Sequence, residues 1–74
     1  MTGLRKRSVT LAGHATSIAL EPEFWAVLDA RAKAEGLSLA GLVARIDEAR
    51  GPRALASTLR VAALQWSSLE SNVR

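Results

Sequence analysis

Apolar and polar residues alternate in the first part of the chain, with the two-residue period of a half-buried strand. The first apolar pair, Val9 and Leu11, occupies odd positions, whereas Ile18 and Leu20 occupy even positions. One regular strand cannot bury both pairs on the same face, and Gly13 between them permits a bend or a bulge. We therefore expect two extended pieces with a break near Gly13, the second being the firmer strand.

After this strand the apolar residues recur with a helical period, and three helices are expected. The first runs from about Pro22 to Glu35, because proline suits the first turn of a helix, where its missing N–H costs nothing. Its apolar stripe consists of Phe24, Leu28 and Ala32, with Trp25 and Val27 flanking it. We expect Trp25, like Trp66 further along the chain, to be a core or helix-packing anchor. The second helix begins after Ser38, a favourable N-cap residue, and ends near Arg50.

The third expected helix spans residues 53–69 and carries a long apolar stripe. The members of the stripe recur at helical spacing: Leu55, Leu59, Ala62, Trp66 and Leu69. Val61 and Leu64 widen the stripe, so we expect this helix to be buried on more than one side.

Length and composition bound the possibilities. A chain of 74 residues forms one domain at most, and 49% hydrophobic residues are too many for a disordered chain. It has no cysteine, which excludes disulfides and fits a cytoplasmic location. Neither an apolar run of membrane-spanning length nor a secretory leader is recognisable, so we expect no membrane association.

The formal net charge of +3 has an uneven distribution. Residues 1–20 contain Arg5, Lys6 and Arg7 and no acidic residue, whereas the bases and acids of residues 21–74 cancel. Such a segment suits a polyanion such as nucleic acid. We expect residues 1–8 to be a flexible basic arm, residues 9–70 a single domain, and residues 71–74 a frayed tail.

A single strand over residues 15–20 would leave both of its edges unpaired, which favours aggregation. We therefore expect a mainly α chain with one strand, which pairs antiparallel with the same strand of a second copy. The two helix pairs would then close over one face of this intermolecular ribbon. The expected dimer core consists of Ile18, Leu20, Phe24, Leu28, Leu42, Val43 and Ile46.

This pattern resembles the ribbon-helix-helix family of dimeric DNA-binding proteins, which includes the Arc and MetJ repressors. The resemblance rests on TSIALEPEFWAVLDARAKAEGLSLAGLVARI, residues 16–46. The longer stretch KRSVTLAGHATSIALEPEFW is similar to a bacterial subgroup of small ribbon-helix-helix proteins, in which a third C-terminal helix is included.

The resemblance implies a function in transcription regulation, with the ribbon inserted in the major groove of DNA. The outward side chains Ala15, Ser17 and Ala19 would then contact bases. The family also binds phosphate with backbone N–H groups at the start of the second helix, here Ser38, Leu39 and Ala40, since a helix N-terminus favours anions. The basic residues Arg5, Lys6 and Arg7 would add phosphate or groove contacts.

Two alternatives to a DNA-binding regulator follow from the same residues. Two of the three outward residues are alanine, which suits packing against a protein, so the alternative is a dimeric protein-interaction module in which the third helix binds the partner. An antitoxin fits less well, because the residues after position 50 are helical and apolar. No nucleophile–base pair, metal-ligand cluster or Gly-rich phosphate loop is present in the sequence, so we expect neither an enzyme nor a metal or other cofactor.

Overall fold

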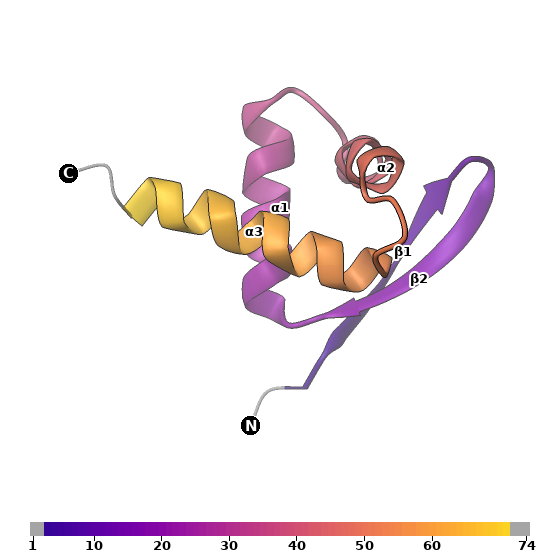
Figure 1. Ribbon diagram of the computed structural model, residues 1–74, viewed down its shortest axis with the longest axis horizontal. Coiled ribbons are helices and arrows are strands. Elements are labelled where there is room, and N and C mark those ends of the chain that lie inside the picture. Colours follow the sequence, from indigo (N-terminus) through magenta and orange to yellow (C-terminus); the bar gives the residue numbers. More distant parts are fainter. Residues whose placement is uncertain (1–2, 72–74) are drawn as a thin grey trace.

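The computed structural model describes residues 3–71, with side chains described for residues 3–67. Five elements follow one another along the chain: β1 Arg5–Leu11, β2 His14–Leu20, α1 Pro22–Ala34, α2 Leu39–Ala49 and α3 Leu55–Ser71. The two strands lie along one side of the molecule and the three helices gather on the other (Figure 1). A mainly helical chain with a two-stranded antiparallel ribbon and a third helix is therefore confirmed.

The ribbon is a hairpin within one chain. β1 pairs antiparallel with β2, and the register sets Arg7 opposite Ile18 and Val9 opposite Thr16. The expected pairing of a single strand with a second copy is thus corrected, because β1 supplies the missing neighbour. The two extended pieces separated near Gly13 are confirmed.

The expected flexible arm is also corrected, because residues 5–8 belong to β1. Charge suggested a solvated arm, but Arg5 and Lys6 occupy exposed positions of the hairpin, where a charged side chain does not oppose strand pairing. Residues 1 and 2 of the expected arm lie outside the described residues, as do residues 72–74 of the expected tail. α3 itself continues to Ser71.

A two-residue turn reverses the chain between the strands. Ala12 and Gly13 have positive φ angles of 52° and 83°, as the two central residues of a type I′ turn require. Reversal changes which positions share a face, because residues opposite each other in a ladder point to the same side. Val9, Leu11, Ile18 and Leu20 consequently all point toward the helices and are buried.

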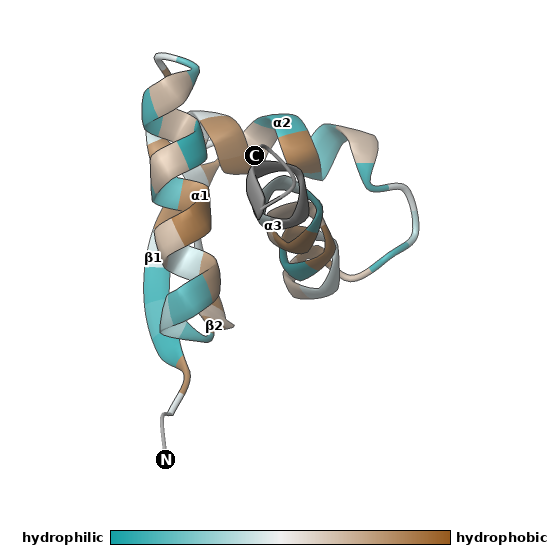
Figure 2. Ribbon diagram, turned by 90° about the vertical axis from the view of Figure 1, so that its left-hand side faces the viewer, coloured by the Kyte–Doolittle hydropathy of each residue, from teal (hydrophilic) through white to brown (hydrophobic). Residues whose placement is uncertain are grey.

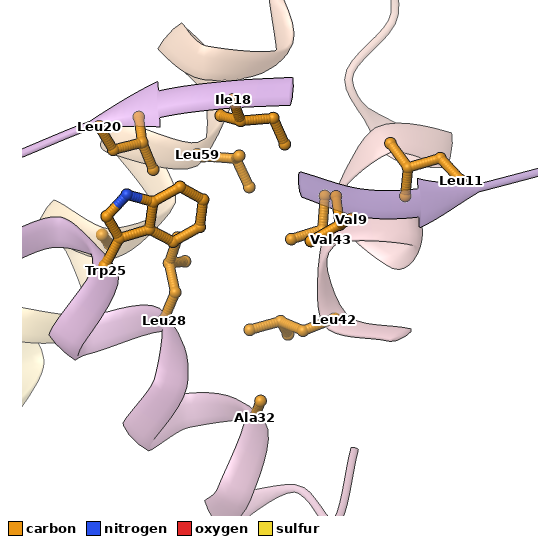
Figure 3. Packing of buried hydrophobic residues seen from close by; sticks show 11 residues of the cluster. Val9, Leu11, Ile18, Leu20, Trp25, Leu28, Ala32, Leu42, Val43 and Leu59 are labelled. Atoms are coloured by element: carbon orange, nitrogen blue, oxygen red, sulfur yellow. The ribbon is translucent and has the colours of Figure 1, made fainter. Parts of the chain in front are cut away.

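These four side chains form one core with residues of all three helices (Figure 3). The helical members are Trp25, Leu28, Ala32, Leu42, Val43, Leu59 and Ala63. Of the residues expected in a dimer core, Ile18, Leu20, Leu28, Leu42 and Val43 are buried here within a single chain, whereas Phe24 and Ile46 are half-buried against the cluster. The core thus closes around the chain's own β1.

On α1 the buried stripe differs from the expected one only in its first member. Trp25, Leu28 and Ala32 are buried, and Phe24 is only partly covered. The i, i+3, i+7 spacing serves a helix face as well as i, i+4, i+8 does, so the period alone did not distinguish the two. The indole N–H of Trp25 donates to the backbone carbonyl of Arg5 at 2.8 Å, which ties α1 to the start of β1.

The expectation that α3 is buried on more than one side is wrong. Leu59 and Ala63 are buried, and Leu55 and Trp66 pack against the core. Val61 and Leu64 on the other side of the helix are 38% and 63% exposed. The side chain of Leu69 lies outside those described. α3 contacts α1, α2 and β2, and its buried residues Leu59 and Ala63 lie on one face of the helix while Val61 and Leu64 face away from the core.

Ion pairs connect the elements around this core. Glu35 follows the last residue of α1 and binds Arg31 of the same helix and Arg45 of α2. Glu21, between β2 and α1, binds Arg60 of α3 at 3.0 Å. The hydrogen bond from Arg31 lowers the pKa of Glu35, and the one from Arg60 lowers the pKa of Glu21.

Replacing Ala12 by Asn tests the hairpin turn. Asparagine tolerates positive φ and is the preferred first residue of a type I′ turn, so Ala12→Asn should raise the free energy of unfolding by up to about 1 kcal/mol. The measurement is urea denaturation followed by circular dichroism. Gly13→Ala is the control and should be destabilising; an unchanged or lower stability of Ala12→Asn would contradict the turn.

The ion pairs of Glu35 predict a pH dependence of stability. A carboxylate whose pKa is lower in the folded state than its unfolded value of about 4.3 stabilises the fold fully above about pH 4.3. This stabilisation is lost as the pH falls through the folded-state pKa. Glu35→Gln should therefore be less stable than wild type at pH 7, and the difference should shrink by pH 3 in urea denaturation. Glu48→Gln, which removes an exposed carboxylate without an ion pair among the described residues, should show no such convergence. A difference that is equal at both pH values would argue against the pair.

Candidate nucleic-acid interface

The outer face of the hairpin, opposite the helices, is the first part of the candidate site. The register aligns three cross-strand pairs on it: Lys6 with Ala19, Ser8 with Ser17, and Thr10 with Ala15. Ala19 is half-exposed, and the other five side chains are exposed. Each of the two alanines is thus paired with a residue that carries a hydrogen-bond donor, and the middle pair is two serines.

The structure enlarges the set of outward residues expected from the sequence. Ala15, Ser17 and Ala19 lie on the outer face, and Lys6, Ser8 and Thr10 lie on it with them. Lys6 thus belongs to the ribbon and not to an arm. The sequence carries a signal for these three residues, since they occupy the even positions that alternate with the apolar odd positions Val9 and Leu11.

The hairpin carries positive charge at the open end of the ribbon. Arg5, Lys6 and Arg7 belong to the first half of β1, where Figure 2 shows the strand as hydrophilic. Arg7 lies with its guanidinium 4.8 Å from the centre of the Trp25 ring and 3.0 Å from a carboxylate oxygen of Asp29. Arg5 and Lys6 form no ion pair with any described residue.

The N-terminus of α2 is the second part of the candidate site. Ser38 is its N-cap residue, and the Ser38 hydroxyl accepts a hydrogen bond from the amide of Gly41 at 3.0 Å. A helix leaves its first N–H groups without intrahelical acceptors, so the amides of Leu39 and Ala40 are free to bind an outside acceptor. The first turn of α2 contains no acidic residue, and the positive end of the helix dipole is therefore not neutralised locally.

The core couples the two parts of the site. α2 contacts β1, and Val9 of β1 and Val43 of α2 belong to the same buried cluster (Figure 3). Both residues are almost fully buried. The outer face of the hairpin and the start of α2 are thus connected through the shared core.

Other kinds of site are not found within the part of the chain that the structure describes. Among the described side chains, no three of His, Asp or Glu gather in a way that would hold a metal ion. None of the described helices combines the length and apolarity that a membrane crossing requires.

Comparison with known proteins gives the family. Residues 4–67 match the family model described as the ribbon-helix-helix domain. The fold is also similar to that of an uncharacterized protein from Bordetella pertussis Tohama I, with a TM-score of 0.79 and 37% sequence identity. That alignment covers 95% of this chain but only 60% of the Bordetella protein, so this chain spans about three fifths of its neighbour's length. No match was found among curated proteins.

Removing the N-cap side chain of α2 tests how much the cap stabilises the protein. Ser38→Ala should lower the free energy of unfolding by about 1 kcal/mol, because the amide of Gly41 loses its acceptor. Ser38→Asp should restore most of this stability, since its carboxylate caps equally well. Urea denaturation of the three proteins is the measurement, and equal stability of wild type and Ser38→Ala would show that the cap contributes nothing.

Proposed function

This chain belongs to the ribbon-helix-helix domain family, and on that premise we propose that it is a DNA-binding protein that regulates transcription. The outer face of its hairpin enters the major groove, and the start of α2 binds a backbone phosphate. Ribbon-helix-helix proteins are generally DNA-binding regulators and typically act as homodimers. A cytoplasmic location is part of the proposal.

One observation carries this function: a polar hairpin face without any carboxylate, next to the basic half of β1. The major groove is about 12 Å wide and admits a two-stranded ribbon, whose strands lie about 4.8 Å apart. All acidic residues follow β2 in the sequence, so the outer face itself carries no carboxylate. Electrostatic attraction to the phosphates therefore favours approach with the hairpin foremost.

Base contacts would come from both strands. Lys6 suits the acceptors O6 and N7 of guanine, and Ser8 and Ser17 can donate to or accept from any base edge. The methyl groups of Ala15 and Thr10 suit the C5-methyl group of thymine. Discrimination by this face thus depends on Lys6 and the hydroxyl groups more than on the alanines.

Phosphate contacts would hold the ribbon in register. The amides of Leu39 and Ala40, with Ser38 as the cap, form an anion site of the kind found at helix N-termini. Such contacts position a protein on the duplex without specifying the sequence.

A homodimer of this chain does not need to form the ribbon between the two copies. Because one chain already forms a complete ribbon, a second copy brings a second ribbon rather than completing the first. We propose that two copies bind two half-sites related by two-fold symmetry, about one helical turn of DNA apart.

The second candidate function is a protein-interaction module, and the exposed apolar side chains of α3 favour it. Val61 and Leu64 are 38% and 63% exposed. They lie on α3, which makes none of the DNA contacts proposed for the ribbon and the start of α2. Leu64→Glu separates the two functions, because it should leave the affinity for DNA nearly unchanged and weaken only binding to a protein partner.

A carboxylate on the outer face tests the principal proposal. Ser17→Glu places a negative charge at the centre of the hairpin and should weaken binding to a random-sequence duplex by about tenfold or more, as repulsion from the phosphates replaces a hydrogen bond. Fluorescence anisotropy with a labelled duplex at two salt concentrations is the measurement. Wild-type affinity should fall steeply with salt, because counterions are released on binding.

Gln65→Glu is the matched control, since it adds the same charge at an exposed position of α3. It should change the affinity by less than about twofold, because separated surface charges are screened. Equal effects of the two substitutions would show that the hairpin face has no special role, and undetectable binding of the wild type at low salt would refute DNA binding altogether.

A further inference from the structure

A hollow of about 290 Å³ lies between the first half of β1 and one side of α1. Arg5, Lys6 and Arg7 line it from the strand, and Pro22, Trp25 and Asp29 are among the residues that line it from the helix. No residue of β2 contributes to it. The hollow therefore lies at the edge of β1 that does not pair with β2, directly beside the outer face of the hairpin.

Two contacts hold the strand side of this hollow in place. The indole N–H of Trp25 donates to the carbonyl of Arg5 at 2.8 Å, and the ring is only 3% exposed. The Arg7 guanidinium lies over the same ring, and its Nη1 is 3.0 Å from Oδ2 of Asp29. The buried indole thus fixes both the backbone of Arg5 and the side chain of Arg7. Arg7 therefore loses little conformational entropy when a ligand binds.

The charges around the hollow do not balance. Three cations face one carboxylate, and Asp29 is engaged by Arg7 alone. Elsewhere among the described side chains, Arg31, Arg45, Arg50 and Arg60 are each paired with a carboxylate. Lys33 and Arg53 also lack an ion pair among the described residues, but they are far apart in the sequence, whereas Arg5 and Lys6 are adjacent and line one concave site together with Arg7.

We propose that this hollow binds a phosphate of the DNA backbone, at the rim of the groove that the hairpin occupies. The inference rests on the proposed function and deepens it, because it adds a phosphate site separate from the start of α2. The major groove is about 8.5 Å deep, so when the outer side chains reach the bases, the sugar-phosphate wall stands beside the edge of the ribbon. Arg5 then meets the phosphate directly, and Arg7 provides a guanidinium that suits two phosphate oxygens. Lys6, on the outer face, stays available to the bases.

Asp29 determines how strongly this site binds. Its carboxylate orients Arg7, but it also cancels one of the three charges and, with its side chain 50% exposed, repels an approaching phosphate. Trp25 still holds Arg7 when the carboxylate is removed. Loss of the charge of Asp29 therefore strengthens phosphate binding instead of weakening it.

The experiment compares Asp29→Asn with Glu48→Gln, which removes an exposed carboxylate of α2 and changes the net charge equally. Affinity for a labelled random-sequence duplex is measured by anisotropy over a series of salt concentrations. Asp29→Asn should bind about three- to tenfold more tightly, with a salt slope steeper by up to about 0.9, and Glu48→Gln should change affinity by less than about twofold. Arg7→Gln should bind more weakly than wild type.

A second measurement follows the indole N–H resonance of Trp25 in wild-type protein, with that of Trp66 as the internal reference. Titration with the duplex should shift the Trp25 signal, whereas inorganic phosphate or a poly-glutamate peptide at the same concentration should not. A shift of equal size with either of these would assign the hollow to a free anion or to an acidic peptide and overturn the proposal. Circular dichroism confirms that each variant is folded.

The outcomes distinguish this inference from the proposed function. If the duplex binds and Ser17→Glu abolishes binding, but Asp29→Asn and Glu48→Gln behave alike, the phosphate site is refuted and DNA binding stands. If the wild-type protein binds no duplex at low salt, both proposals are refuted.

Discussion

The antiparallel pairing of β1 with β2 within one chain is the constraint on which the rest of the structure depends. It is made possible by the two positive φ angles at Ala12 and Gly13, which turn the chain with the twist that a hairpin needs. The reversal gathers apolar residues from odd and even positions on one face and polar residues on the other. Both the core and the candidate interface follow from this separation.

The helices complete what the hairpin begins. α2 packs on β1 and α3 packs on β2, so each strand has its own helical cover. α3 is therefore a structural part of a single-chain core, in which Leu59 and Ala63 are fully buried. A small domain gains little stability from its core alone, and the pairs of Glu21 and Glu35 with arginines of other turns and helices add connections at its margins.

The same separation of faces leaves the positive charges of β1 on a surface that can meet a polyanion. The basic residues of β1 lie beside the outer face, and α2, whose first turn carries no acidic residue, packs on β1 within the shared core. Trp25 connects the core to the surface. Its ring is buried, its N–H binds the backbone carbonyl of Arg5, and the face of its ring packs against the side chain of Arg7. The surface proposed to meet DNA thus rests on side chains that the core immobilises.

Local patterns in the sequence were sufficient for the three helices, for the cap at Ser38 and for the apolar faces of the strands, because each depends on neighbours within a few positions. They also placed Ala15, Ser17 and Ala19 on the outer face. The pairing of the strands was not accessible in this way: the run Arg5–Arg7 resembled a solvated arm, and the conflict between odd and even positions disappears only once the chain reverses. That α3 is buried on one side alone, and that Phe24 is only partly covered while the neighbouring Trp25 is buried, likewise depended on the packing of distant segments, since helical periodicity is equally satisfied by adjacent stripes.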